Sequence, residues 1–111
     1  ALAAAFPRGA HQPVVLGVAA RAAGLGPLDA AHCVAYETVS APATAAVRLL
    51  SLDPFKATAV LARLAPEMDR VAERAAQAGR QGIDALPAAS SPLLDITAEQ
   101  HAAWPVRLFA S

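Results

Sequence analysis

The sequence predicts an all-α helical bundle, and three observations support this fold class. Apolar residues recur at three- and four-residue steps, which is the spacing of amphipathic helices. Alanine supplies much of the hydrophobic content, and the sequence shows no strand pair, internal repeat or glycine-rich phosphate loop. With 111 residues and five aromatic side chains, we expect a single domain, 1–111, whose thin core forms between closely approaching helices.

The first expected helix spans about 13–24. Pro13 suits its first turn, where the missing N–H costs nothing, and Gly24 can adopt the left-handed cap. A second helix should begin near Pro27, with Asp29 in the first turn complementing the helix dipole. The apolar positions of the first helix lie at helical spacing: Val14, Val15, Val18, Ala22 and Leu25.

The segment Ser40-Ala41-Pro42 allows two interpretations. Either Ser40 caps a fresh helix with Pro42 in its first turn, or one long helix bends there. The small residues from 41 to 46 would let another helix approach closely. The sequence therefore predicts that the segment 41–50 is the central, most buried helix.

Asp53-Pro54 is the clearest helix start, with an acidic N-cap followed by proline at the first helical position. Pro66 should kink this helix, Gly79 should end it, and 83–91 is expected to be a loop. An apolar stripe runs along it at three- and four-residue steps: Ala57, Val60, Leu61, Leu64, Met68, Val71 and Ala75.

The last segment, 91–111, is unusually apolar for a chain end and carries the only tryptophan, Trp104. Thr97 and Gln100 fit a capping box, which predicts a helix from Thr97 to about Ala103. Trp104 and Phe109 are either tucked against the domain or anchors of an interface. Such an ending suggests docking, on the rest of this chain or on another protein.

The charge balance gives no case for nucleic acid or an anionic membrane as partner, because nine basic residues oppose nine acidic ones. The sequence contains no uninterrupted run of eighteen apolar residues, so it predicts no membrane span. The start lacks a methionine and the cationic segment of a signal peptide, so it resembles a cut inside a longer protein.

Residues able to carry chemistry are few. The single cysteine, Cys33, excludes an internal disulfide, fits a reducing cytosol and is expected to be a small buried helix residue. No triad order and no zinc spacing are present, so we assign no catalytic, cofactor-binding or metal-ligating residue. Arg48 is either amphipathic cover, the favoured interpretation, or a fixed donor for a partner's carboxylate or phosphate.

Three blocks, in this order, resemble the C-terminal half of the UreF family of urease accessory proteins. They are Ala45-Ala46-Val47-Arg48-Leu49, then Pro92-Leu93-Leu94-Asp95-Ile96 with a following His101, and finally Arg107-Leu108-Phe109-Ala110-Ser111. The likeness runs from about His11 to Ser111, is strongest to actinobacterial members, and leaves the N-terminal part of the fold missing. Two departures are Leu52-Asp53-Pro54 in place of a Leu-Gly-Gln type segment, and Ala102 in place of an acidic residue.

The resemblance implies a cytoplasmic, non-enzymatic, homodimeric component of a nickel metallochaperone complex. With UreD, also called UreH, it would recruit the GTPase UreG, modulate GTP hydrolysis and direct nickel insertion into apo-urease. Nickel and GTP would be handled by the partner proteins, with no cofactor bound directly. Arg48 is then expected at the dimer or the UreG-facing surface. The UreD-facing residues would be Leu93, Leu94, Asp95, His101, Arg107, Leu108, Phe109 and Ser111.

Two other function classes remain open from the residues alone. One is a small helical enzyme or metal carrier that uses His32, Cys33 and Tyr36. The other is a structural helical bundle with no partner. Without the N-terminal half of the fold, the central helix would expose apolar surface, so we expect the chain to self-associate through that surface.

Overall fold

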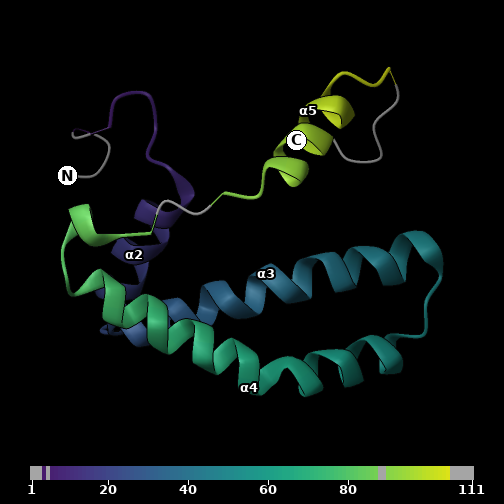
Figure 1. The fold of residues 1–111 in the computed structure, drawn as a ribbon, viewed down its shortest axis with the longest axis horizontal. Helices are drawn as coiled ribbons and strands as arrows, with labels where there is room; N and C mark the ends of the chain where they lie inside the picture. Colours follow the sequence, from purple (N-terminus) through teal and green to yellow (C-terminus); the bar gives the residue numbers. More distant parts are fainter. Residues whose placement is uncertain (1–3, 5, 88–89, 106–111) are drawn as a thin grey trace.

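The computed structural model describes residue 4 and the ranges 6–87 and 90–105. They form α2 (Gln12–Ala22), α3 (Pro27–Leu50), α4 (Pro54–Gly79), the 3₁₀ turn η1 (Ile83–Ala85) and α5 (Pro92–Ala102), as Figure 1 shows. These residues contain no strand, so the all-α class predicted from the sequence is confirmed. Within these ranges, no helix combines the length and apolar character needed to cross a membrane.

α2 lies within two residues of the predicted 13–24, with proline in its first turn. Gly24 adopts φ +78°, the left-handed conformation that glycine tolerates. The Leu25 N–H donates to the Ala20 carbonyl at 2.9 Å, and the Gly24 N–H donates to the Arg21 carbonyl at 3.1 Å. These two bonds form a Schellman motif, which ends the helix where the glycine predicted it.

α3 runs without interruption from Pro27 to Leu50. Asp29 acts at its start as predicted, because its Oδ2 accepts from the Gly26 N–H at 2.8 Å. Pro42 lies inside the helix, so the interpretation in which Ser40 caps a fresh helix is wrong. A continuous helix is the cheaper solution, since proline removes one backbone donor whereas a new N-terminus leaves four without acceptors.

α4 begins as the Asp53-Pro54 pair predicts. The Asp53 Oδ1 accepts from the Phe55 N–H at 2.9 Å, and proline occupies the first turn. Pro66 lies inside the helix, whose axis changes direction about midway along its length, in line with the predicted kink (Figure 1). The helix ends at Gly79, and the expected loop that follows contains the short turn η1.

α3 and α4 form an antiparallel hairpin whose helices draw together toward the end that meets α2 (Figure 1). Two residues in the described part of the chain are buried, Ala72 at 0% exposure and Ala76 at 4%. At the same end the His32 Nε2 lies 3.3 Å from the Asp69 Oδ1 and links the two helices. Small side chains at 72 and 76 allow this close approach.

The prediction that 41–50 is the most buried segment is wrong. No residue of α3 is buried, and Leu49 and Leu50 are exposed near the loop that leads into α4. The small residues of 41–46 could accept a neighbouring helix closely, but α4 makes its close approach at the opposite end of the hairpin. Burial therefore followed the small residues of α4, Ala72 and Ala76, instead of those of α3.

The apolar stripe of α4 is also displaced from its predicted position. The most covered line follows steps of four, three, four and four residues: Leu61, Ala65, Met68, Ala72 and Ala76. The branched side chains of Val60, Leu64 and Val71 stand beside this line and remain exposed. Alanine at the contact brings the backbones together, and the larger neighbours stay accessible to solvent.

Candidate functional site

The apolar segment that begins at residue 91, which the sequence singled out, folds into helix α5. The helix begins at Pro92, and the Ser91 carbonyl accepts from the Leu94 N–H at 2.8 Å and from the Asp95 N–H at 3.2 Å. Asp95 in the first turn and His101 in the last turn both complement the helix dipole. The helix ends at Ala102, close to the predicted Ala103.

The predicted start of this helix at Thr97 is wrong. Thr97 lies inside α5, and its Oγ1 donates to the carbonyls of Leu93 and Leu94, each at 2.9 Å. The proposed capping box with Gln100 therefore does not form. Pro92 explains the earlier start, because its fixed φ and missing N–H suit the first helical position. The threonine hydroxyl then bonds backward to the preceding turn.

α5 presents exposed aliphatic side chains along one arc. Leu93, Leu94 and Ile96 are exposed by 74%, 69% and 55%. At the helical repeat of about 100° per residue, these side chains lie on the side opposite Asp95 and Glu99. No other described helix contacts α5. The arc is therefore unpacked apolar surface, with two carboxylates on the far side of the helix, within the part of the chain that the structure describes.

The end of α5 carries an aromatic pair. The rings of His101 and Trp104 meet edge to face, with centroids 5.2 Å apart and an interplanar angle of 62°. Trp104 is 60% exposed, so it is not tucked against the helical hairpin. Leu94 and His101 are seven residues apart and share one side of the helix. The aliphatic arc thus leads into the aromatic pair and extends the exposed surface.

The other predicted partner-binding residues are not brought together with α5. Arg48 is exposed in the last turn of α3, where it borders a shallow hollow with Ser40, Ala41, Thr44 and Ala45. It forms no ion pair with the residues that the structure describes. The terminal block Arg107, Leu108, Phe109 and Ser111 lies outside the described residues.

The residues of the metal-carrier hypothesis all lie on α3. His32 is bound to Asp69 across the hairpin, whereas Cys33 and Tyr36 are exposed. The prediction that Cys33 is buried is therefore wrong, because the half-covered side of α3 carries its neighbours Ala31, His32 and Ala35 instead. Within the described ranges, no three histidine, cysteine or carboxylate side chains lie close enough to hold one metal ion.

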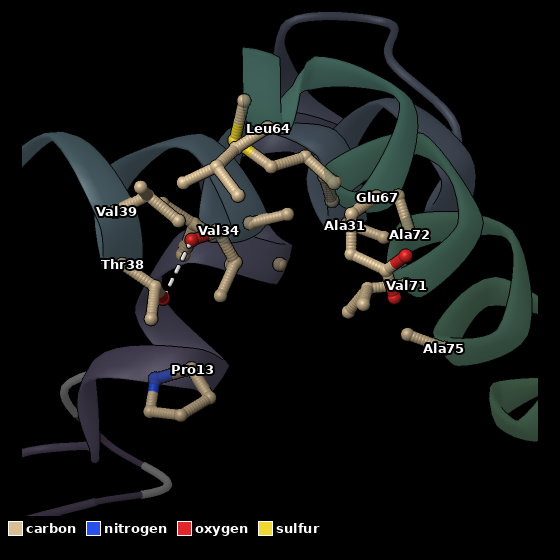
Figure 2. A pocket seen from close by; sticks show the side chains of 15 residues that line it. Pro13, Ala31, Val34, Thr38, Val39, Leu64, Glu67, Val71, Ala72 and Ala75 are labelled. Atoms are coloured by element: carbon tan, nitrogen blue, oxygen red, sulfur yellow. Dashed lines mark hydrogen bonds between the residues drawn. The ribbon is translucent and has the colours of Figure 1, made fainter. Parts of the chain in front are cut away.

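An apolar groove opens between α2, α3 and α4, and sequence reasoning missed it (Figure 2). Its volume is about 450 Å³. Residues from all three helices line it: Pro13, Leu16, Gly17, Ala30, Ala31, Val34, Ala35, Thr38, Val39, Leu64, Glu67, Met68, Val71, Ala72 and Ala75. The predicted stripe of α4 contained the signal for it, since Leu64, Met68, Val71 and Ala75 belong to both.

Glu67, at the rim of this groove, is the centre of a small charge cluster. Its Oε2 accepts from the Arg70 Nε at 3.0 Å and is also paired with the Arg70 Nη2, while its Oε1 lies 3.9 Å from the Arg74 Nη2. The hydrogen bond from Arg70, followed by the positive charge of that residue, holds the pKa of Glu67 below its usual value. The carboxylate is thereby ionised and occupied at neutral pH.

Comparison with known proteins now bears on the three blocks noted in the sequence. The family model of UreF matches residues 1–65, which is more than half of the chain. A urease accessory protein UreF of Mycobacterium sp. (strain JLS) is 43% identical over 107 residues, or 96% of this chain and 47% of that protein. The UreF of Mycolicibacterium vanbaalenii is 43% identical over 101 residues, and covers 91% of this chain.

A third relative, the UreF of Mycobacterium bovis (strain BCG / Pasteur 1173P2), is 37% identical over 91 residues. The chain spans less than half the length of these relatives, namely 47%, 44% and 40% of them. No solved structure matches it significantly. The match of the family model and the identity to these relatives show that the chain belongs to the UreF family.

Proposed function

We propose that this chain acts as a urease accessory protein and that its contribution is protein binding through α5. The observation that carries the proposal is the aliphatic arc of Leu93, Leu94 and Ile96, which the described part of the chain leaves unpacked. Membership in the UreF family supplies the context, since the relatives carry the name urease accessory protein. An exposed apolar arc with an aromatic end is typical of an interface.

We propose more specifically that α5 and the terminal block face UreD, and that the complex recruits UreG for nickel insertion into apo-urease. In this proposal the chain works in the cytoplasm as a homodimer, modulates the UreG GTPase, and leaves nickel and GTP to its partners. Asp95 would form ion pairs at the edge of the UreD contact, and His101 would pack in it beside Trp104. Arg48 would serve the dimer or the UreG-facing surface, where its exposed guanidinium can meet a carboxylate.

The test measures binding of UreD to the intact chain and to leucine variants of matched exposure. Leu94 in α5 is 69% exposed and Leu50 at the end of α3 is 68% exposed, so burial would remove a similar area of each side chain from water. Leu94→Gln and Leu50→Gln are compared because leucine and glutamine have similar helix propensities. Helicity by circular dichroism checks that both variants keep the fold.

We expect Leu94→Gln to weaken UreD binding at least about tenfold, since burying a leucine contributes roughly 1.5–3 kcal/mol and 1.4 kcal/mol is a factor of ten. Leu50→Gln should bind as the unmodified chain does. Fluorescence of Trp104, the only tryptophan, should shift to shorter wavelength when UreD covers it. Equal affinities for the two variants, with no shift in emission, would remove α5 from the interface.

Arg48 needs a test of its own, because it lies apart from α5. Arg48→Ala and the matched change Arg63→Ala, an exposed arginine of α4, are compared for chain dimerisation and for recruitment of UreG to the UreD complex. We expect Arg48→Ala to weaken either dimerisation or UreG recruitment, and Arg63→Ala to weaken neither. If both variants dimerise and recruit UreG normally, Arg48 has no role in assembly.

A further inference from the structure

We propose that the apolar groove between α2, α3 and α4 is one side of a hydrophobic core. Its occupant is an apolar helix face from the part of the UreF fold that this chain does not span. The inference depends on family membership and on the geometry of the groove. It does not depend on the proposed binding of UreD.

The walls of the groove are aliphatic on three sides. α2 contributes Pro13 and Leu16, α3 contributes Val34, and α4 contributes Leu64 and Val71 (Figure 2). The outer ends of these side chains remain accessible, with Val34 exposed by 44%, Leu64 by 37% and Val71 by 42%. Three helices thus present apolar side chains toward one open space, as the helices around a core position do.

The polar groups of the groove are already satisfied within the chain. The Thr38 Oγ1 donates to the Val34 carbonyl at 2.8 Å, and the Glu67 carboxylate is occupied by Arg70. A small-molecule site normally offers several convergent polar groups that orient its ligand. This groove offers none of these, so the chemistry that fits it is the apolar face of a protein helix.

The exposed area of the chain indicates how much surface is left to cover. The chain exposes 9054 Å², whereas a compact monomer of 11.3 kDa exposes roughly 5,700 Å² by the usual scaling with mass. The excess, about 3,300 Å² on this chain alone, is several times the roughly 800 Å² that each partner contributes to a standard protein–protein contact. A transient partner would therefore leave much of it uncovered.

Two observations favour the rest of the fold over a second copy. The chain spans 47% of the Mycobacterium sp. (strain JLS) relative, so the folded relative contains a further half that must pack somewhere. A twofold dimer also requires a self-complementary patch, and a groove lined by three helices needs a ridge opposite it. The aliphatic arc of α5 is the one ridge described in this chain, so its entry into the groove is a distinguishable outcome.

The experiment compares the 111-residue chain with a chimera in which the unmatched part of the strain JLS relative is joined to it in the relative's order. Val71 lines the groove, whereas Val60, on the same helix and 41% exposed, does not. Val71→Gln and Val60→Gln are made in both proteins. A second pair, Ala75→Gln in the groove and Ala62→Gln outside it, repeats the comparison with smaller changes.

In the chimera we expect Val71→Gln and Ala75→Gln to lower the thermal midpoint while Val60→Gln and Ala62→Gln leave it unchanged. In the 111-residue chain the members of each pair should behave alike, because both are exposed there. Amide exchange along α4 from Leu64 to Ala75 should be at least about tenfold slower in the chimera. This pattern would establish the groove as half of a core.

Three results would overturn the proposal. An equal difference between the paired variants in both proteins would mean that the groove is covered without the added half. Concentration-dependent protection of the groove in the chimera would make a second copy the occupant. Protection in the chimera that is lost in Leu94→Gln would make α5 the occupant. None of these readouts involves UreD or urease, so failure here leaves the proposed function separately testable.

Discussion

The contact between α3 and α4 depends on the small side chain of Ala72, and Ala72→Leu tests this directly. Ala72 is fully buried, so the added isopropyl group has no space and must separate the two helices. Overpacking of this kind costs typically 1–3 kcal/mol of unfolding free energy. Ala62→Leu is the matched control, because Ala62 lies ten residues earlier on the same helix and is exposed.

The assay is thermal unfolding of the 111-residue chain and of both variants, followed by far-ultraviolet circular dichroism. A loss of about 2 kcal/mol should lower the midpoint of Ala72→Leu by roughly 8–16 °C, given about 4–8 °C per kcal/mol for a domain of this size. Ala62→Leu should unfold within a few degrees of the unmodified chain, since exposed substitutions change stability by about 0.5 kcal/mol or less.

Identical midpoints for the two variants would refute the reasoning. They would show that α3 and α4 do not pack through Ala72, and the groove beside that contact would lose its geometric basis. A lower midpoint for both variants would indicate instead that leucine anywhere on α4 promotes association, which light scattering of the heated samples would reveal.

Three further predictions concern the helices themselves. Asp53→Ala should lower the unfolding free energy by about 1 kcal/mol in urea titrations while Asp53→Asn keeps it, because both Asp and Asn accept from the Phe55 N–H. Pro42→Ala should raise the unfolding free energy by at most about 3 kcal/mol, and the thermal midpoint with it, since alanine supplies the backbone N–H that proline lacks inside α3. Glu67→Gln should destabilise the chain at neutral pH but not in acid. The pKa of Glu67 is lower in the folded state than its unfolded value of about 4.5. The stability that Glu67 contributes is therefore present above about pH 4.5 and is lost as the pH falls through the lowered folded-state pKa. A midpoint for Glu67→Gln that differs from the unmodified chain equally at pH 7 and pH 2 would contradict this assignment.

Local signals in the sequence determined where most helices begin and end. Gly24 stops α2, Asp53-Pro54 starts α4 and Gly79 ends it, because each acts through backbone geometry or a hydrogen bond to a near neighbour. The error at α5 arose where two local signals competed. Ser91-Pro92 lay upstream of a plausible capping box, and the threonine hydroxyl bonded backward instead.

The sequence singled out the apolar segment that forms α5, and the aliphatic side chains of this helix are exposed. That this segment binds a partner stays a prediction. The assignment of Arg48 to the dimer or the UreG-facing surface also stays a prediction, and Arg48 lies on a helix that makes no contact with α5. Sequence spacing cannot give the distance between Arg48 and α5, since no local interaction determines where a helix at the end of a loop lies relative to the hairpin. The UreF resemblance came from the order of three short blocks. The family model over residues 1–65 and the 43% identity to a relative over 96% of the chain confirm the family.

Periodicity alone established that α4 is amphipathic, but it could not say which part of its wide apolar face would be buried. Only the packing of α3 against α4 decided that. The helices meet where Ala72 and Ala76 allow their backbones to approach, so the larger Leu64 and Val71 are left on the rim of a groove. The sequence by itself determined the helices and the family. Among the residues that the structure describes, tertiary packing decided that most large apolar side chains stay exposed, because burial depends on which faces find a partner.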